Sequence, residues 1–137
     1  KAPLYAPVED RDVWDDPPSA DEDWVRFLAP LDPLLWNRAL FREVYGHGYT
    51  WEVYKKPNQR EHGYYCLPVI FNGDFVGLIE PWFDKKERRL EIRSFHLKDG
   101  KADRKRLRKA LEGELAAFAE YLGAEKVLAG KVRLYSG

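Results

Sequence analysis

The sequence predicts an α+β fold, built on an antiparallel β meander of four to five strands with a short N-terminal helix and a long C-terminal amphipathic helix. Aromatic residues make up 15% of the chain, and their flat rings pack well on the pleated surface of a sheet. Several short apolar segments are separated by turn residues, which is typical of neighbouring antiparallel strands. Nearer the C-terminus, apolar residues recur at three- and four-residue spacing, which predicts a helix with one buried face.

At 137 residues the chain has the size of one domain that buries a sufficient core without cross-links. We predict a β-rich domain over residues 27–137, preceded by an extended acidic linker or strap at residues 1–26. Residues 7–23 are rich in acidic residues and proline, and Pro17 and Pro18 exclude a regular helix there. Trp14 and Trp24 are candidate anchors for this segment, and residues 3–6 could form the last strand of a preceding domain.

A short helix is predicted to begin at Asp32 and Pro33 and to end at Gly46. The Asp32 side chain can cap the free N–H groups of the first turn, and Pro33 suits the first helical position. Glycine readily adopts the left-handed conformation that ends many helices. The expected apolar stripe consists of Leu34, Leu35, Ala39, Leu40 and Val44.

The apolar patterns predict four strands, at Tyr49–Tyr54, Tyr64–Phe71, Phe75–Pro81 and Arg89–Leu97. The second is apolar on both faces and is therefore expected to be central, although Pro68 requires a bulge or a free edge. Asn72 and Gly73 predict a type I′ hairpin between the second and third strands. A charged turn at residues 84–87 joins the third strand to the fourth.

The long helix is predicted over Arg104–Leu122, with Asp103 as its cap and Gly123 as its end. Its apolar face consists of Leu107, Leu111, Leu115, Phe118 and Leu122. After this helix, Val127–Tyr135 could add a last strand to the sheet.

Charge is divided unevenly along a chain whose formal net charge is zero. Residues 1–33 hold nine acidic and three basic residues, a net charge of −6, whereas residues 34–137 hold fourteen and twenty, a net charge of +6. A neutral total argues against a simple basic nucleic-acid domain. The basic part could still face an anion, with the acidic segment as a solvated linker.

Three basic clusters are candidate nucleic-acid contacts. They comprise Lys55, Lys56 and Arg60; Lys85, Lys86 and Arg88; and Arg104, Lys105 and Arg108. Cations in loops neutralise phosphates without demanding a sequence, but an ordinary solvated surface explains the first two clusters as well. The third opposes the dipole at the start of a helix, which a nearby anion would explain. Compensation by Asp103, Glu112 and Glu114 is the alternative.

Motifs for catalysis or cofactor binding are missing from the sequence. It contains no GxSxG, P-loop or HExxH pattern, so no catalytic residue is predicted. One cysteine and three scattered histidines give no zinc spacing, and neither a metal nor another cofactor is expected. His62 and His96 are interpreted as polar residues at strand ends. Glu80 and Asp84 could form a carboxylate pair, but a strand end and a turn residue is the favoured interpretation.

Several features of the sequence bear on the cellular compartment of the protein and on whether the chain is complete. A single cysteine, Cys66, excludes an intrachain disulfide and favours a reducing cytoplasm. No apolar run is long enough to span a bilayer, and the first ten residues lack the apolar core of a signal peptide, so no membrane partner is expected. The chain contains no methionine and starts at Lys1-Ala2-Pro3, which we interpret as a piece of a longer protein.

Three blocks of sequence together resemble a known family. They are FLAPLDPLLWNR at residues 27–38, EVY at 52–54 followed by GYYCLP at 63–68, and NGD at 72–74 followed by GLIEP at 77–81. In this order and spacing they resemble the C-terminal part of the winged-helix crosslink-repair DNA glycosylases, the AlkZ/YcaQ-like family. The resemblance runs from about Tyr5 to Leu122.

This resemblance implies a protein of tandem winged helices followed by a β-rich domain, which hydrolyses the N-glycosidic bond of alkylated or crosslinked bases. The family's catalytic motif, Gln–hydrophobic–Gln or Gln–hydrophobic–Asp, belongs to the N-terminal winged-helix region. The single glutamine here, Gln59, precedes Arg60 and Glu61, which is not that motif. The resemblance thus implies a C-terminal domain that contributes to DNA binding, is not catalytic by itself, and has DNA and its own N-terminal winged-helix region as partners.

Two alternatives remain at this stage: a non-enzymatic winged-helix protein that binds DNA or regulates, and a structural, partner-binding domain. The strand with Glu80 also departs from the family pattern, because Leu78 and Trp82 stand where Arg and Lys are common. Any DNA contact of that strand is therefore expected to be weaker or different. For Trp82 and Tyr64, packing in the core is favoured over stacking on a base.

Overall fold

The structure of this chain, a computed structural model, describes residues 5, 7–16, 22–98, 100 and 102–135. The α-helices are α1 (Arg11–Asp15), α2 (Pro33–Trp36), α3 (Arg38–Tyr45) and α4 (Arg104–Leu122). The strands are β1 (Val25–Phe27), β2 (Leu67–Phe71), β3 (Asp74–Asp84), β4 (Arg89–Lys98) and β5 (Lys126–Tyr135). Short 3₁₀ helices are η1 (Val8–Asp10), η2 (Glu52–Tyr54) and η3 (Pro57–Gln59).

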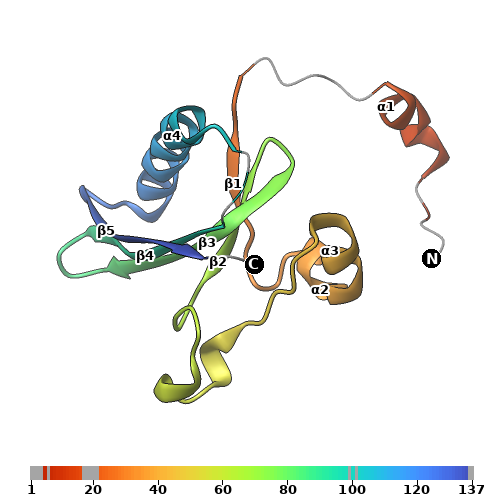
Figure 1. Ribbon diagram of the computed structural model, residues 1–137. Helices are drawn as coiled ribbons and strands as arrows, with labels where there is room; N and C mark the ends of the chain where they lie inside the picture. The colour runs from red at the N-terminus through yellow and green to blue at the C-terminus, as the bar shows by residue number, and fades with distance from the viewer. Residues whose placement is uncertain (1–4, 6, 17–21, 99, 101, 136–137) are drawn as a thin grey trace.

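The five strands form one sheet in chain order, β1-β2-β3-β4-β5 (Figure 1). From β1 to β4, neighbouring strands pair antiparallel, as the predicted meander requires. β5 pairs parallel to β4, because α4 returns the chain along the sheet before β5 begins. The predicted α+β class and last strand are therefore confirmed, with one parallel pair in an otherwise antiparallel sheet.

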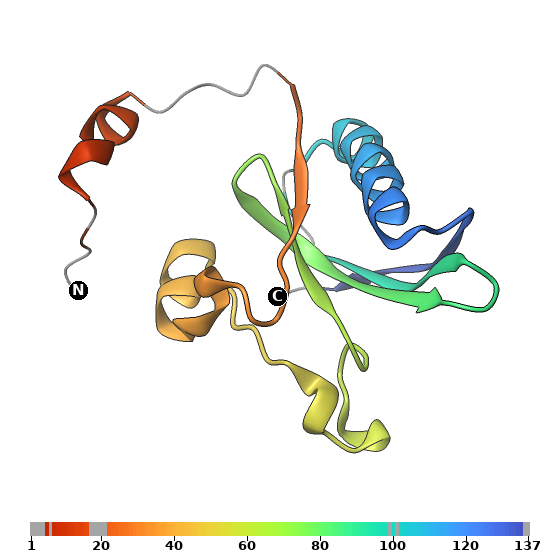
Figure 2. The ribbon, with the colours of Figure 1, turned by 180° about the vertical axis from the view of Figure 1, so that it is seen from behind.

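α4 and the pair α2–α3 lie on opposite sides of the sheet (Figure 1, Figure 2). Beneath α4, a buried cluster joins Leu107 of the helix to Ile79 of β3. On the other side, Phe41 of α3 packs with Leu78 of β3 in a second cluster. Successive residues of a strand point to opposite faces, so Leu78 and Ile79 of β3 belong to different clusters. The molecule thus has three layers, with the sheet in the middle.

β2 is buried on both faces, as predicted for a central strand, but it is shorter than expected. It begins at Leu67, because the N–H groups of Tyr64 and Tyr65 donate to a side-chain carboxylate and join no ladder. Pro68 accepts a hydrogen bond from the Leu28 N–H and lies just beyond the end of β1, so its missing N–H breaks no ladder bond. The register between β2 and β3 shifts one residue later.

Local turn and cap signals are confirmed. Asn72 and Gly73 both have positive φ, 48° and 88°, as a type I′ hairpin requires. The Asp103 side chain accepts hydrogen bonds from the N–H groups of Lys105 and Arg106 and caps α4. Gly123 ends that helix in the left-handed conformation. These features depend on residues that are neighbours in the chain.

The predicted short helix is divided in two at Asn37. Asp32 caps α2 as expected, but the Asn37 side chain accepts a hydrogen bond from the Leu40 N–H and starts α3 as a separate helix. Gly46 ends α3 in the left-handed conformation. The buried residue of α3 is Phe41, while Ala39 and Val44 of the predicted stripe are exposed.

The predicted strand at Tyr49–Tyr54 is wrong. Alternating apolar residues suggested a strand, but residues 52–54 form the 3₁₀ helix η2. The reason is Glu52, which lies inside the molecule where a strand would have left it on the polar face. Tyr49 is also buried, and its hydroxyl donates to the Cys66 carbonyl oxygen. Burial of Tyr49 raises the pKa of its hydroxyl.

The N-terminal segment holds three elements that the sequence did not predict. Residues 8–15 form η1 and α1, although an extended segment was expected there, and Pro17-Pro18 and most of residues 3–6 lie outside the described residues. Val25–Phe27 forms β1, and Val25 is fully buried, so the β-rich fold already includes residues 25 and 26. Trp24 donates its backbone N–H to Asn72, as suits an anchor.

None of the described helices is long and apolar enough to cross a membrane.

Candidate nucleic-acid interface

The three predicted basic clusters lie in three separate parts of the molecule (Figure 1). The first is on the loop between η2 and β2, the second at the β3–β4 turn, and the third at the start of α4. Each cluster therefore has to be assessed on its own contacts.

Four of the nine predicted cations have partners within the molecule. Lys55 pairs with Glu52, Arg88 with Glu125 and Arg108 with Glu112, and the Arg60 guanidinium donates to the Lys55 carbonyl oxygen. The other five are exposed and form no ion pair with another described residue. They are Lys56, Lys85, Lys86, Arg104 and Lys105. These five are the predicted cations that we consider further as contacts for an external anion.

At the start of α4, internal carboxylates account for much of the positive charge. Arg106 donates from Nε to Asp23 at 2.8 Å, and Asn72 donates to the same carboxylate at 2.8 Å. These hydrogen bonds hold the pKa of Asp23 below its usual range. Together with the Asp103 cap and the Arg108–Glu112 pair, they support compensation within the protein as the explanation for this cluster. Only Arg104 and Lys105 of its predicted members stay without such a partner among the described residues.

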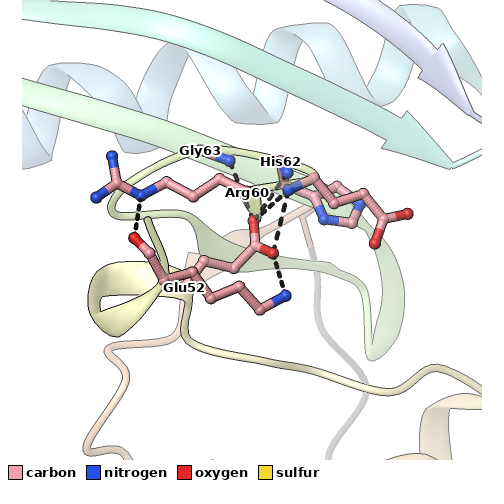
Figure 3. Close-up of polar contacts among 6 residues, drawn as sticks. Glu52, Arg60, His62 and Gly63 are labelled. Carbon is pink, nitrogen blue, oxygen red and sulfur yellow. Dashed lines mark hydrogen bonds and ion pairs between the residues drawn. The ribbon is translucent and has the colours of Figure 1, made fainter. Parts of the chain in front are cut away.

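The most specific arrangement is the loop of residues 52–65, which Glu52 holds in place (Figure 3). The Glu52 carboxylate accepts hydrogen bonds from the backbone N–H groups of Glu61 at 3.0 Å, His62 at 2.8 Å and Gly63 at 3.4 Å. It also accepts from the Lys55 ammonium at 2.7 Å. One buried carboxylate therefore closes the loop at its base, from both ends.

The electrostatics of Glu52 explain why a buried acid is stable there. Burial by itself opposes ionisation and raises the pKa of Glu52. Hydrogen bonds from Lys55 and from the backbone of His62, Glu61 and Gly63 outweigh burial and lower this pKa to about 2. The carboxylate is therefore charged at neutral pH, and its hydrogen bonds are of the strong, charge-assisted kind.

A second carboxylate, Glu80 of β3, holds the other end of the loop. It accepts hydrogen bonds from the N–H of Tyr64 at 2.7 Å and of Tyr65 at 3.4 Å. Gly63 packs against it so closely that a Cβ atom there would lie 2.7 Å from the Glu80 carboxyl carbon. Nε2 of His96 lies 2.8 Å from the His62 carbonyl oxygen, which can only accept, so this ring nitrogen donates. The loop is thus fixed to the sheet at four consecutive residues, 62–65.

These contacts correct several side-chain interpretations. Glu80 lies in the middle of β3, so it is not a strand-end residue, whereas His96 lies near the end of β4, as predicted. His62 lies on the 52–65 loop and not at a strand end. Glu80 and Asp84 do not form a pair, because Asp84 accepts from the N–H groups of the following turn. Burial raises the pKa of the Cys66 thiol to about 12, which leaves it protonated and unreactive at neutral pH.

Tyr64 and Trp82 do not fill the core, which corrects the sequence interpretation. Their exposed fractions are 41% and 43%, and each ring lies under a guanidinium group. The Arg60 guanidinium carbon is 4.7 Å from the centre of the Tyr64 ring, and that of Arg93 is 3.9 Å from the Trp82 ring. Both are cation–π contacts at the surface.

Sequence reasoning therefore found the cations of the loop but missed the residues that position them. Glu52 was placed within a predicted strand, and His96 was given no role in holding the loop. A signal was present in the sequence, since a glutamate directly after a tryptophan in an apolar segment is expected to need a partner if it is buried. The identity of that partner, the backbone of residues 61–63, could not be read from the sequence.

Comparison with known families agrees with the resemblance of the three sequence blocks. The chain matches the model of the family described as DNA glycosylase AlkZ-like, over residues 3–121. This match covers most of the 137 residues, and the chain belongs to that family. Membership relates the chain to DNA repair glycosylases and implies DNA as a ligand. No solved structure matches the chain.

Proposed function

We propose that this chain is the C-terminal, β-rich domain of a DNA repair glycosylase that acts on alkylated or crosslinked bases, and that it contributes to DNA binding. The observation that supports this most is family membership over residues 3–121, together with a basic loop that is fixed in place. On this loop Lys56 is exposed, and Arg60 is directed by its contacts with the Lys55 carbonyl and Tyr64.

A fixed loop suits phosphate binding for an energetic reason. Association costs free energy for every segment that must be ordered, so cations on a preformed backbone bind more tightly than cations on a mobile one. The two buried or half-buried carboxylates supply that order without using the cations at the loop surface, apart from Lys55. The exposed lysines of the β3–β4 turn and the start of α4 are candidates for further phosphate contacts.

Three groups of this region, Glu52, Glu80 and Cys66, have structural contacts rather than the freedom that catalysis needs. Hydrolysis of an N-glycosidic bond needs a group free to activate water or to stabilise the sugar cation. Glu52 and Glu80 both accept backbone hydrogen bonds, and the Cys66 thiol is buried. Gln59 lies on η3 within the basic loop and is followed by Arg60. Because this sequence lacks the Gln–hydrophobic–Gln or Gln–hydrophobic–Asp motif of the family, we assign the chemistry to a winged-helix region that carries it.

The binding claim is tested by the salt dependence of the affinity of the 137-residue chain for a labelled DNA duplex. If three of the five unpaired cations contact phosphates, the affinity should fall by about 40-fold between about 50 and 200 mM salt. Lys56→Ala, the pair Lys85→Ala/Lys86→Ala and the pair Arg104→Ala/Lys105→Ala each reduce the salt slope by about 0.9 for every contact that is lost. Arg11→Ala is the matched control, since Arg11 is exposed and pairs with Asp15 in the acidic segment. Salt-insensitive binding, or equal effects of Arg11→Ala and the cluster variants, contradicts the proposal.

The enzymatic part of the proposal is tested separately, by base release from alkylated and crosslinked duplexes. We expect release by a protein that combines this chain with the winged-helix motif, and none by this chain alone. Binding without base release by the longer protein would instead support a regulatory DNA-binding protein.

A further inference from the structure

The side of the sheet opposite α4 carries a group of exposed aromatic rings. Tyr54 is 87% exposed, and Trp36, Tyr64, Tyr65 and Trp82 are also exposed. Single exposed apolar residues are common on protein surfaces, but a group of large rings marks a binding surface more often. The rings come from α2, the 52–65 loop and β3, so the fold brings them together from distant parts of the chain.

Contacts between the rings make much of this surface continuous. The Trp51 ring meets the Tyr54 ring edge-on at 5.6 Å and the Tyr65 ring edge-on at 5.9 Å, between ring centres. Trp51 also lines an open groove of about 390 Å³, together with Trp36 and Arg38. The rings therefore extend from the groove beside α2 to the 52–65 loop.

The surface continues from the loop onto the sheet. Glu80, which binds the N–H groups of Tyr64 and Tyr65, and Trp82 are alternate residues of β3 and so share one face of the strand. Two guanidinium–ring pairs, Arg60 on Tyr64 and Arg93 on Trp82, thus lie on the same side of the sheet.

Charge on this surface favours an anionic ligand. Its cations are Arg38, Lys55, Lys56, Arg60 and Arg93, and its carboxylates are Glu52, Glu61, Glu80 and Glu91, which leaves an excess of one positive charge. Rings interleaved with cations are the chemistry that binds single-stranded nucleic acid, because bases stack on the rings while cations neutralise the phosphates. A regular duplex offers phosphates to such a surface but not the faces of its bases.

We propose that this surface binds unpaired nucleotides of DNA by stacking, with the Tyr54 ring and the guanidinium groups held over Tyr64 and Trp82 as the planes that receive bases. The inference rests on the proposed DNA-binding function and gives it a preferred ligand, a single-stranded segment. A glycosylase substrate contains such a segment wherever a lesion or an extruded base interrupts pairing. The cations at the β3–β4 turn and at the start of α4 would then contact paired DNA on either side.

The test compares binding of the 137-residue chain to an oligothymidine of about 12 nucleotides and to a duplex of the same length, at low salt, by quenching of tryptophan fluorescence. We expect tighter binding of the single strand. Tyr54→Ala, Tyr64→Ala and Trp82→Ala should each weaken it by about 5-fold or more, and Tyr54→Ala and Trp82→Ala should leave duplex binding within about 2-fold. Tyr54→Phe, which keeps the ring, should restore the affinity for the single strand.

Tyr121→Ala is the matched control, because Tyr121 is 84% exposed on α4, away from this surface. Equal losses for Tyr54→Ala and Tyr121→Ala, or no loss for any of the three ring variants, overturn the inference. Equal weakening of single strand and duplex by Tyr54→Ala or Trp82→Ala also overturns it, since the rings would then not distinguish unpaired bases. If duplex binding is salt-dependent but oligothymidine binding is absent, the proposed function stands and this inference fails. Circular dichroism establishes that each variant is folded.

Discussion

On one side of the sheet α4 contributes apolar side chains to a common core, whereas on the other the 52–65 loop is attached by two carboxylates. Beneath α4, Leu107 and Ala119 are buried among side chains of four strands. In the loop, the buried contact is between Glu52 and backbone N–H groups, with Lys55 as counter-ion.

This difference has consequences for specificity. Apolar packing is non-directional, so many residues of similar volume satisfy it. A carboxylate that accepts several N–H groups is directional, and no other side chain of similar size reproduces its charge and geometry. The α4 side should therefore determine stability, while the loop side should determine the position of the basic and aromatic residues. The variants below separate the two, from the largest expected effect to the smallest.

Leu107→Ala should give the largest loss of stability. The side chain is buried beneath α4, and its truncation leaves a cavity, at a cost of about 2–5 kcal/mol in the free energy of unfolding. Urea unfolding followed by circular dichroism measures this loss. Leu128→Ala is the control, because Leu128 of β5 is exposed, and it should change stability by less than about 0.5 kcal/mol. Similar losses for both variants would show that the α4 side is not the main core.

Glu52→Gln should loosen the loop without unfolding the sheet. At neutral pH the amide lacks the charge that strengthens these hydrogen bonds, and we expect a loss of about 2–3 kcal/mol, concentrated in the loop. Hydrogen exchange should become faster at the N–H groups of Glu61 and His62 and stay unchanged in the middle of α4. Glu61→Gln, at an exposed carboxylate, is the control. Uniformly faster exchange would contradict a local role for Glu52.

The pH dependence of stability sharpens the same comparison. The pKa of Glu52 falls from an ordinary value of 4.5 to about 2 on folding, so its ionisation stabilises the folded chain fully above about pH 4.5. This contribution, at most roughly 3 kcal/mol, is lost as the pH falls from about 4.5 to about 2. The difference in unfolding free energy between the wild type and Glu52→Gln should therefore shrink over this window. A difference that is constant across it would show that the pKa of Glu52 is not lowered.

Replacing glycine by alanine should destabilise the protein on one side of the sheet and stabilise it on the other. At Gly63 a Cβ atom would lie 2.7 Å from the Glu80 carboxyl carbon, so alanine should cost about 1–2 kcal/mol and displace the loop. At Gly113, within α4, no atom lies within 4 Å of an added Cβ, and alanine should stabilise by about 0.5–1 kcal/mol. Thermal unfolding measures both. A neutral Gly63→Ala variant would show that Glu80 moves aside at little cost.

Much of the fold could be predicted from the sequence, for reasons that the elements themselves show. The bounds of α4, its Asp103 cap and the Asn72-Gly73 turn are correct, because each depends on residues a few positions apart. The three-residue strand β1 was missed, because so short a segment becomes a strand only by pairing with β2, more than forty residues later. The segment Tyr49–Tyr54 was wrong, since its alternation hid a glutamate that is buried by a distant part of the chain.

For the candidate site, the sequence by itself determined which residues carry charge and rings, and its three blocks determined the family. Only the tertiary structure decided that the basic clusters lie apart, that Tyr64 and Trp82 are at the surface, and that Glu52 and Glu80 fix the loop. The physical reason is the separation along the sequence of the residues that interact. Caps and turns are set by neighbouring residues, whereas Glu52 meets N–H groups 9 to 11 residues ahead and Glu80 one 16 residues behind, which only the folded sheet brings within reach.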